Sequence, residues 1–256
     1  MKNLLVSLAA VAAMATYGTS FAQTKWDLPS GYGANTFHVQ NLTQFAADVD
    51  KATTGKLKIT IHPNASLFKA NEIKRAVQSG QTPIGEFILS SASNEAPIFG
   101  LDAIPFLATS YADAKRLDAA SRDLLVKTLA AQGIKLLYTV PWPPQSLYSK
   151  KALTKLADLK STKMRAYNPA TSFIASAVGA QPVTIQLAEL PAALATGGVD
   201  NFLTSTSSGI DSRLYESVNF FYDVNAWLPR NAVVVNQKSF DALDKTEQAA
   251  VLQQAS

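Results

Sequence analysis

The sequence contains no cysteine among its 256 residues. This absence excludes disulfides, thiol nucleophiles and cysteine-ligated metal sites together. Only two histidines are present, His38 and His62, and they lie in different segments without the spacing of a metal site. Charged residues form only 16% of the chain, and the net charge of +4 is spread along it without a basic block. The sequence therefore gives no indication of disorder, of a nucleic-acid-binding surface or of an anionic-membrane surface.

Motifs of catalysis and of nucleotide binding are also missing. No HExxH, GxSxG or Walker loop occurs, and the carboxylates are scattered without an obvious acid–base pair. Residues 31–36 resemble half of a dinucleotide fingerprint but lack its third glycine, so we expect only a loop whose backbone N–H groups face a ligand. A Ser-His-Asp arrangement stays open, because its members need not be adjacent in sequence. We predict no catalytic residue, no metal and no cofactor.

The first 22 residues have the pattern of a secretion signal. Lys2 gives a positive start, and residues 4–14 form an apolar run that is too short to span a bilayer. Ser20 and Ala22 place small residues at the −3 and −1 positions of a cleavage site. We therefore expect a Sec-type signal peptide over residues 1–22 and a mature protein in the periplasm, with an uncleaved membrane anchor as the alternative.

Strand and helix patterns alternate along the rest of the chain. The alternation predicts an α/β protein with parallel sheets and helices on both faces. Segments near residues 145–148 and 225–230 are expected to cross between two halves. The predicted domains are residues 23–146 with 230–256, and residues 147–229. The expected strands are 24–28, 57–61, 84–89, 134–140, 159–166, 182–185, 199–203, 218–224 and 232–236; the expected helices are 37–52, 71–78, 110–131, 171–178, 187–195 and one begun by Asp244.

Ligands of α/β sheets bind beyond the carboxyl ends of strands. That rule selects loops rich in hydroxyls, amides and aromatics, with a single arginine, Arg165, at the end of a short strand. A planar guanidinium can give a carboxylate two parallel hydrogen bonds. Most arginines are solvated surface residues, and each tryptophan could equally be a core or hinge residue. The candidate ligand-binding residues are Arg165, Asn168, Thr204, Trp142, Tyr32, Ser91, Glu189 and Trp227.

Five blocks of sequence occur in an order that resembles one protein family. They are residues 72–80 (EIKRAVQSG), 99–107 (FGLDAIPFL), 156–165 (LADLKSTKMR), 179–183 (GAQPV) and 189–200 (ELPAALATGGVD). Each block alone is a weak signal. Together they are similar to the DctP-type extracytoplasmic solute-binding proteins of TRAP transporters, and the similarity covers nearly all of the expected mature chain.

The resemblance implies a two-domain periplasmic-binding-protein-like fold, type II-like, with hinge connections and a ligand cleft between the domains. It implies that Arg165 binds the ligand's carboxylate, that Asn168 supports the ligand and that Thr204 lies in the pocket. Asn201 and Ser161 stand where the family usually has glycine, which leaves the ligand open among monoacids, aromatic acids and dicarboxylates. The family continues beyond residue 256, so the resemblance also implies a C-terminal truncation.

The predicted function is that of a periplasmic receptor, not an enzyme. It would capture a small organic acid by hinge closure and deliver it to the membrane permease subunits of a TRAP transporter. We expect a monomer that binds no nucleic acid and is not embedded in the membrane after signal removal. Two alternatives are an exported small-molecule hydrolase and a receptor that presents its ligand to a sensor protein. A hydrolase would be favoured if His38 lay within hydrogen-bond reach of a loop serine and an acid.

Overall fold

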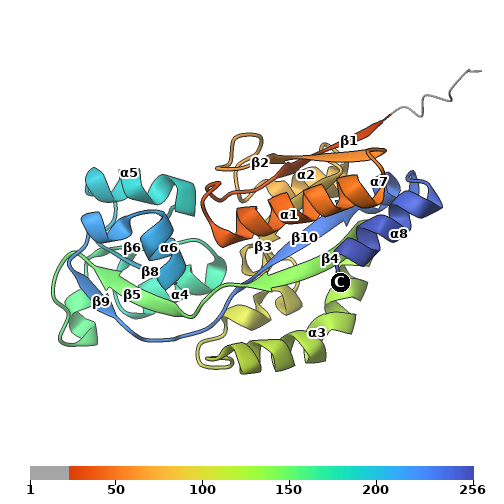
Figure 1. Ribbon diagram of the computed structural model, residues 1–256. Coiled ribbons are helices and arrows are strands. Elements are labelled where there is room, and N and C mark those ends of the chain that lie inside the picture. The colour runs from red at the N-terminus through yellow and green to blue at the C-terminus, as the bar shows by residue number, and fades with distance from the viewer. Residues whose placement is uncertain (1–22) are drawn as a thin grey trace, which may run out of the picture.

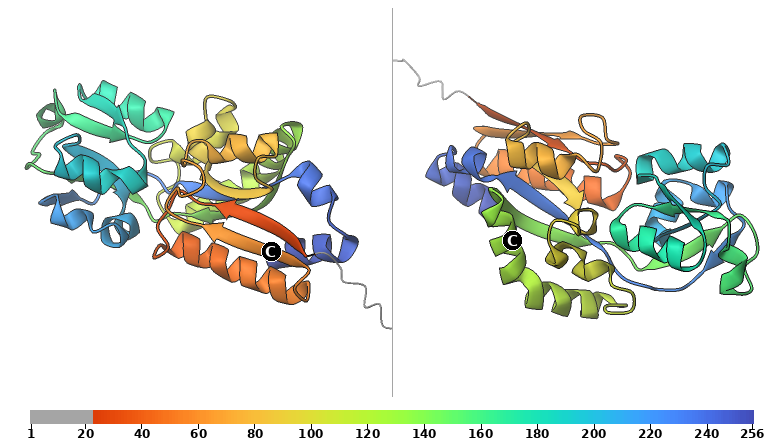
Figure 2. Two further views of the ribbon diagram at one scale, coloured as in Figure 1. Left: turned by 90° about the horizontal axis from the view of Figure 1, so that it is seen from above. Right: turned by 180° about the vertical axis from the view of Figure 1, so that it is seen from behind.

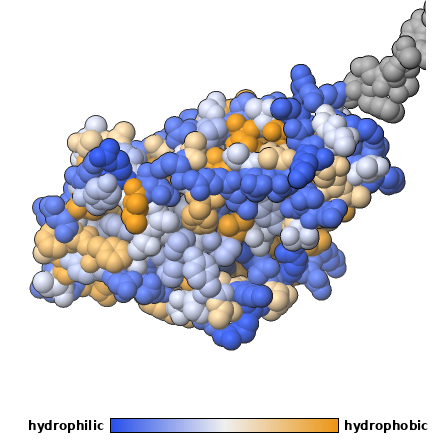
Figure 3. All heavy atoms as spheres, viewed as in Figure 1, coloured by the Kyte–Doolittle hydropathy of each residue, from blue (hydrophilic) through white to orange (hydrophobic). Residues whose placement is uncertain are grey.

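The computed structural model describes residues 23–256, and the predicted signal peptide lies outside that range. Figure 1 shows these residues folded into two lobes that are joined by two extended segments. Hydrophilic residues dominate the face seen in Figure 3, where the hydrophobic residues form small separate patches. Within residues 23–256, no helix combines the length and the apolar character needed to cross a bilayer.

The first lobe contains two sheets, one parallel and one antiparallel. β1 (Thr24–Pro29) and β2 (Leu57–His62) pair in parallel. β10 (Arg230–Asn236) lies between β3 (Ile84–Ile88) and β4 (Ile134–Pro141) and runs antiparallel to both. The expectation of parallel sheets alone was wrong here. β10 enters from the second lobe by an extended segment, so it needs no helical crossover to reach its neighbours.

Helices cover the sheets of the first lobe at positions close to those expected. Each of the longest begins at a side-chain cap: Thr36, Ser110 and Asp244 accept a hydrogen bond from the backbone three residues later. Asp244 and Glu247 form the capping box that the sequence suggested. The helices are α1 (Phe37–Ala52), α2 (Ile73–Ser79), α3 (Tyr111–Ala131), α7 (Gln237–Asp241) and α8 (Lys245–Gln254), with 3₁₀ helices η1 (Leu89–Ala92) and η2 (Pro97–Ala103).

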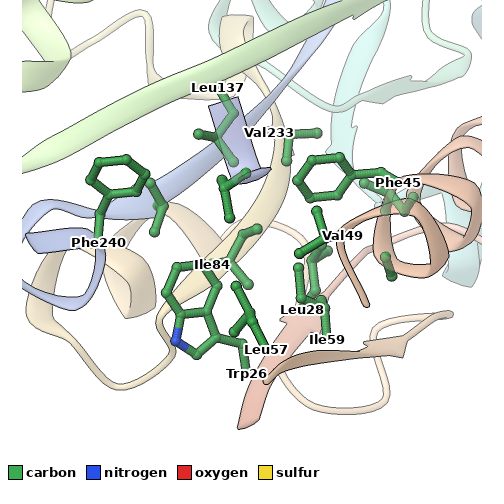
Figure 4. Close-up of a cluster of buried hydrophobic side chains, with 14 of the residues drawn as sticks. Trp26, Leu28, Phe45, Val49, Leu57, Ile59, Ile84, Leu137, Val233 and Phe240 are labelled. Atoms are coloured by element: carbon green, nitrogen blue, oxygen red, sulfur yellow. The ribbon is translucent and has the colours of Figure 1, made fainter. Parts of the chain in front are cut away.

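The main core of the first lobe lies between α1 and the strands. Phe45 and Val49 on one face of α1 pack against Leu28 of β1 and Val233 of β10 (Figure 4). Leu28 and Val233 are fully buried, because strands from both ends of the chain meet there. Segments far apart in sequence therefore hold the lobe together.

The second lobe is built on one mixed sheet of order β7-β6-β8-β5-β9. β6 runs parallel to both β7 and β8, whereas β5 runs antiparallel to β8 and β9. The views in Figure 2 show this lobe standing beside the first, with its own helices around its sheet. Its strands are β5 (Gln145–Ser149), β6 (Lys163–Ala166), β7 (Gln181–Thr184), β8 (Asn201–Ser205) and β9 (Phe220–Tyr222). Its helices are η3 (Leu156–Leu159), α4 (Pro169–Ala177), η4 (Leu187–Glu189), α5 (Leu190–Ala195), α6 (Thr206–Asp211) and η5 (Leu214–Glu216).

The two connections between the lobes run side by side and are hydrogen-bonded to each other. The backbone N–H of Trp142 donates to Pro229 O at 2.7 Å, and that of Gln145 donates to Trp227 O at 2.8 Å. Gln145 already pairs with Ser205 of the second sheet, so the first crossing lies before the segment 145–148 that the sequence suggested. Two adjacent extended segments suit a hinge, because few backbone angles need to change for the lobes to rotate.

A buried ion cluster anchors the second connection where it enters the first lobe. Asp102 of η2 accepts the backbone N–H of Arg230 at 2.9 Å, and the Arg230 guanidinium also contacts Asp118 and Ser121 of α3. Burial raises the pKa of Asp102 to about 7, and the positive charge of Arg230 opposes this rise. Asp102 therefore titrates well above its usual range.

The raised pKa predicts how stability depends on pH. The folded protein holds the Asp102 proton more tightly than the unfolded chain, so protonation of Asp102 adds to the free energy of unfolding. This contribution is complete below about pH 4 and is lost as pH rises toward 7. Asp102→Asn keeps an acceptor for Arg230 N–H but cannot ionise. The melting temperature of the wild type relative to this variant should fall between pH 4 and 7, by about 2–4 °C for each kcal/mol. The exposed Asp123→Asn is the control, and a pH-independent difference between wild type and Asp102→Asn contradicts the assignment.

Candidate functional site

A cavity lies between the two lobes beside their connections. Residues of both lobes contribute to its wall. We call it the inter-lobe cavity. Its lining residues are Gly31, Tyr32, Ala70, Ile88, Trp142, Gln145, Arg165, Tyr167, Gln186, Leu187, Thr204, Ser208 and Pro229.

Arg165 reaches this cavity from β6, the strand between β7 and β8. Its side chain is 4% exposed. Nε donates to Ile185 O at 2.8 Å and Nη1 to Leu203 O at 3.4 Å, so backbone carbonyls just after β7 and within β8 hold the guanidinium in place. Its carbon Cζ lies 4.9 Å from the centroid of the Tyr167 ring. The fixed orientation leaves Nη2 with donors that no described residue uses.

The Arg165 guanidinium is buried without a carboxylate partner among residues 23–256. Burial lowers the pKa of Arg165 to about 10, and Tyr167, Tyr32 and Glu189 act in the opposite direction. The side chain stays protonated at neutral pH. A buried, unpaired cation is costly, and a bound anion removes that cost while using the free donors.

The rest of the lining is neutral. Arg165 is the one charged residue among the residues that line the inter-lobe cavity. Hydroxyl and amide groups of Tyr32, Gln145, Gln186 and Thr204 supply hydrogen-bonding positions. The Thr204 hydroxyl makes no side-chain hydrogen bond to any described residue, so it is free to meet a ligand. The cavity combines one fixed positive charge with neutral polar groups and aromatic surface.

Four of the eight predicted ligand-binding residues line the cavity: Arg165, Thr204, Trp142 and Tyr32. Trp142 and Tyr32 pack edge to face, with ring centroids 4.9 Å apart. Their side chains come from the first connection and from the loop after β1. The structure thus brings together residues from separate predicted loops.

Asn168 and Ser91 lie near the cavity but outside its lining. Asn168 caps α4 by accepting the N–H of Thr171 at 2.8 Å, and its Nδ2 donates across the lobes to Ser90 Oγ at 2.8 Å. Ser91 Oγ donates to Ile88 O at 2.7 Å within its own lobe. Ser91 points away from the second lobe because η1 turns the chain directly after β3. This turn directs Ser90 toward the second lobe instead.

Glu189 and Trp227 also lie outside the lining. Glu189 is exposed, accepts the backbone N–H of Gln186 at 3.2 Å, and borders a neighbouring surface pocket. Trp227 is 1% exposed and packs in the core of the second lobe with Met164 and Leu203. The side chain of Glu189 is held by the cap of η4, and that of Trp227 by the core.

The sequence did not single out four polar residues of the lining. Tyr167 and Ser208 fall inside loops that were selected, between Arg165 and Asn168 and at the end of the run 204–208. Gln145 was placed in a crossing rather than in a pocket. Gln186 carries no sequence signal, because an isolated glutamine before a helix is usually a surface residue.

The sequence predicts partial exposure for His38, with a position facing the cleft as the alternative, and an outward-pointing side chain for Glu86, but both residues are buried. His38 is 0% and Glu86 1% exposed. Glu86 accepts hydrogen bonds from Ser30 Oγ at 2.6 Å and Asn231 Nδ2 at 2.9 Å, and lies 3.1 Å from His38 Nδ1. Since these partners compensate the buried charge, a strand interior can hold it. In residues 23–256, no group of three or more candidate ligands could hold a metal ion.

Comparisons with known proteins agree with this architecture. The model of the DctP family, described as "Bacterial extracellular solute-binding protein, family 7", matches residues 30–256. DctP6 of Bordetella pertussis, an "extracytoplasmic solute receptor binding pyroglutamic acid", is 52% identical, with a TM-score of 0.88 over 91% of this chain and 77% of that one.

Two further proteins extend the comparison. A TRAP solute-binding protein from a marine metagenome, described as specific for pyroglutamate, is 46% identical with a TM-score of 0.89, over the same shares of the two chains. A solute-binding protein of Albidiferax ferrireducens is 27% identical over 96% of this chain and 76% of its own length. These findings confirm the resemblance and the two-domain periplasmic-binding fold predicted from the sequence. The chain belongs to the DctP family of bacterial extracellular solute-binding proteins, family 7, the periplasmic receptors that capture small organic acids for TRAP transporters.

Proposed function

We propose that the inter-lobe cavity binds a small monocarboxylic acid whose carboxylate is held by Arg165. The observation that carries this proposal is a guanidinium that is fixed by two backbone carbonyls, almost fully buried and unpaired within the described chain. Nη2 and the free N–H of Nη1 form an edge that matches the two oxygens of a carboxylate. Thr204, Gln186 and Ser208 would then orient the remainder of the ligand.

The charge of the lining favours one carboxylate over two. A dicarboxylate would place its second charge against neutral groups, since Arg165 is the single charged lining residue. Burying an unpaired carboxylate costs several kcal/mol, which the neutral amides and hydroxyls offset only in part. A neutral polar group at the far end of the ligand meets no such penalty.

Pyroglutamate is the ligand that we propose first. Three solved relatives that are 52%, 46% and 41% identical to this chain are described as binding pyroglutamic acid or pyroglutamate. This acid has one carboxylate and a neutral five-membered lactam, which matches the single positive charge and the neutral polar groups of the lining. The alternative of a dicarboxylate is accordingly disfavoured.

The lobes would act as the two domains of a closing receptor. We propose domains of residues 23–146 with 230–256 and of residues 147–229, and the pairing of Gln145 with Ser205 favours a first boundary two residues earlier. The protein would work as a monomer beside its TRAP permease subunits. Closure around the ligand would bring the wall of the second lobe, with Arg165, against Tyr32 of the first.

The site supports a receptor rather than the hydrolase alternative. His38 contacts Glu86 through Nδ1, but its Nε2 has no hydrogen-bond partner among the described residues. Ser30 donates to Glu86 and not to His38. A hydrolytic nucleophile needs a base within hydrogen-bond reach, and His38 has none to activate. We therefore propose that the chain binds its ligand without transforming it.

Replacing Arg165 tests the carboxylate clamp. Arg165→Ala removes charge-assisted bonds worth about 1.5–3 kcal/mol, so pyroglutamate affinity should fall by about 10- to 150-fold in calorimetry. Arg165→Lys should recover only part of the loss, because an ammonium lacks the planar fork. The Arg75→Ala variant, on α2 and outside the cavity lining, serves as the control with unchanged affinity. Wild-type affinity in Arg165→Ala excludes the clamp.

The bond between Asn168 and Ser90 predicts a separate effect on closure. It joins the two lobes only when they are together, so Ser90→Ala should weaken ligand binding by about two- to ten-fold without touching the ligand. Asn168 still caps α4 in this variant, so the melting temperature of the ligand-free protein should stay close to that of the wild type.

Ser91→Ala provides a matched control for this experiment, because Ser91 bonds to Ile88 within the first lobe. Its ligand affinity should equal that of the wild type. Calorimetry measures both affinities, and X-ray scattering measures the fraction of closed protein at a fixed ligand concentration. Weaker binding by Ser91→Ala alone would restore the direct role first predicted for Ser91 and exclude the contact between the lobes as a determinant.

A further inference from the structure

Asn231 connects the wall of the inter-lobe cavity to the buried carboxylate of Glu86. Asn231 is the second residue of β10 and is fully buried. Its Oδ1 accepts the indole N–H of Trp142 at 2.9 Å and the hydroxyl of Tyr32 at 3.3 Å. Its Nδ2 donates to Glu86 Oε1 at 2.9 Å. Two aromatic residues of the cavity wall therefore share one amide as their polar partner.

The orientation of the Asn231 amide follows from the chemistry of its neighbours. The Trp142 indole nitrogen can only donate, so the group that faces it must be the amide oxygen. Glu86 Oε1 accepts a hydrogen bond on the other side, so the group that faces it is the amide nitrogen. These two requirements agree, and the opposite orientation would leave both contacts without a hydrogen bond.

This orientation dictates the direction of the Tyr32 hydroxyl. Because Asn231 Oδ1 has no hydrogen to give, Tyr32 must donate its proton to it. Burial raises the pKa of Tyr32, so the proton stays on the hydroxyl at neutral pH. The hydroxyl oxygen then offers only lone pairs in its other directions. Tyr32 lines the cavity from the first lobe, and Arg165 and Tyr167 line it from the second.

The Tyr167 hydroxyl is fixed in the same way. Gln145 Nε2 donates to Pro143 O at 3.3 Å, and a backbone carbonyl can only accept. Gln145 Oε1 is left to accept the Tyr167 hydroxyl, at 3.3 Å. Both tyrosine protons are thus used by amides of the protein. The indole N–H of Trp227 faces the Tyr167 oxygen, so the acceptor oxygen that remains on the cavity wall is that of Tyr32.

We infer that Tyr32 selects ligands that carry an N–H or O–H donor next to the carboxylate, and that Asn231 and Glu86 are positioning residues for this selection. The inference rests on the proposed carboxylate site and specifies its substrate class. An acid with only acceptor atoms beside its carboxylate would face a lone pair of Tyr32. A lactam acid such as pyroglutamate presents its ring N–H at this position.

Matched ligand analogues test the inference directly. Calorimetry would compare pyroglutamate with two acids of the same ring size, in which oxygen or CH₂ replaces the ring N–H. The wild type should bind the lactam at least about ten-fold more tightly than either analogue, because a site built for a donor rejects analogues that lack it. Equal affinity for the three acids overturns the inference.

Two variants assign the selection to Tyr32. Tyr32→Phe removes its acceptor oxygen, so the preference for the lactam over the analogues should shrink to about two-fold. Tyr138→Phe is the matched control, since the Tyr138 hydroxyl is buried without a hydrogen-bond partner among the described residues and lies outside the cavity lining. Its preference should equal that of the wild type. A preference that survives in Tyr32→Phe excludes Tyr32 as the selecting group.

The proposed function and this inference fail in distinguishable ways. Loss of selectivity with intact, Arg165-dependent binding overturns the inference alone. Binding of the lactam that is unchanged in Arg165→Ala, or absence of binding by all three acids, overturns the carboxylate site and the inference together. Asn231→Leu adds a further test of positioning, because it should lower the lactam preference while ligand binding still depends on Arg165.

Discussion

The uncompensated charge of Arg165 is the constraint on which the site depends. The guanidinium is held by two backbone carbonyls, those of Ile185 and Leu203, and is removed from water, yet the described chain supplies no anion to balance it. A protein tolerates such a charge where a bound anion neutralises it. The same desolvation that destabilises the empty site strengthens the ion pair in the bound one. The neutral lining adds selectivity, because it leaves nothing to compensate a second charge.

The connections between the lobes place this charge opposite the residues that complete the cavity. Trp142 belongs to one connection and Pro229 to the other, and a backbone hydrogen bond joins them. Asn231 follows directly on β10 and accepts the indole N–H of Trp142. The wall of the cavity is therefore continuous with the hinge. Trp142 lines the cavity and also joins the two segments about which the lobes would rotate.

Much of the fold and the centre of the site could be predicted from the sequence, because both depend on local signals. The period of the strands and helices, the cap at Asp244 and the position of Arg165 at a strand end are all local features. The antiparallel course of β10 and the burial of Glu86 depend on contacts between residues more than one hundred positions apart. The family resemblance implied that Asn168 supports the ligand, and in the structure its side chain caps α4 and bonds to Ser90.

Under the proposed function, Asn168 joins the two lobes and Arg165 binds the ligand. Affinity and specificity can then be set by different residues. Contacts with the ligand determine which acid is bound. Contacts between the lobes determine the free energy of closure, and therefore how much of the ligand's binding energy is used to close the lobes. Polar contacts between the lobes include Asn168 with Ser90 and Asn35 with the backbone of Asp211. Such bonds are replaced by water on opening, so their net contribution is about 0.5–1.5 kcal/mol each. Apolar side chains of both lobes, such as Val39 and Leu187, also belong to one buried cluster, so the lobes have contacts of their own besides the proposed ion pair between Arg165 and a bound carboxylate.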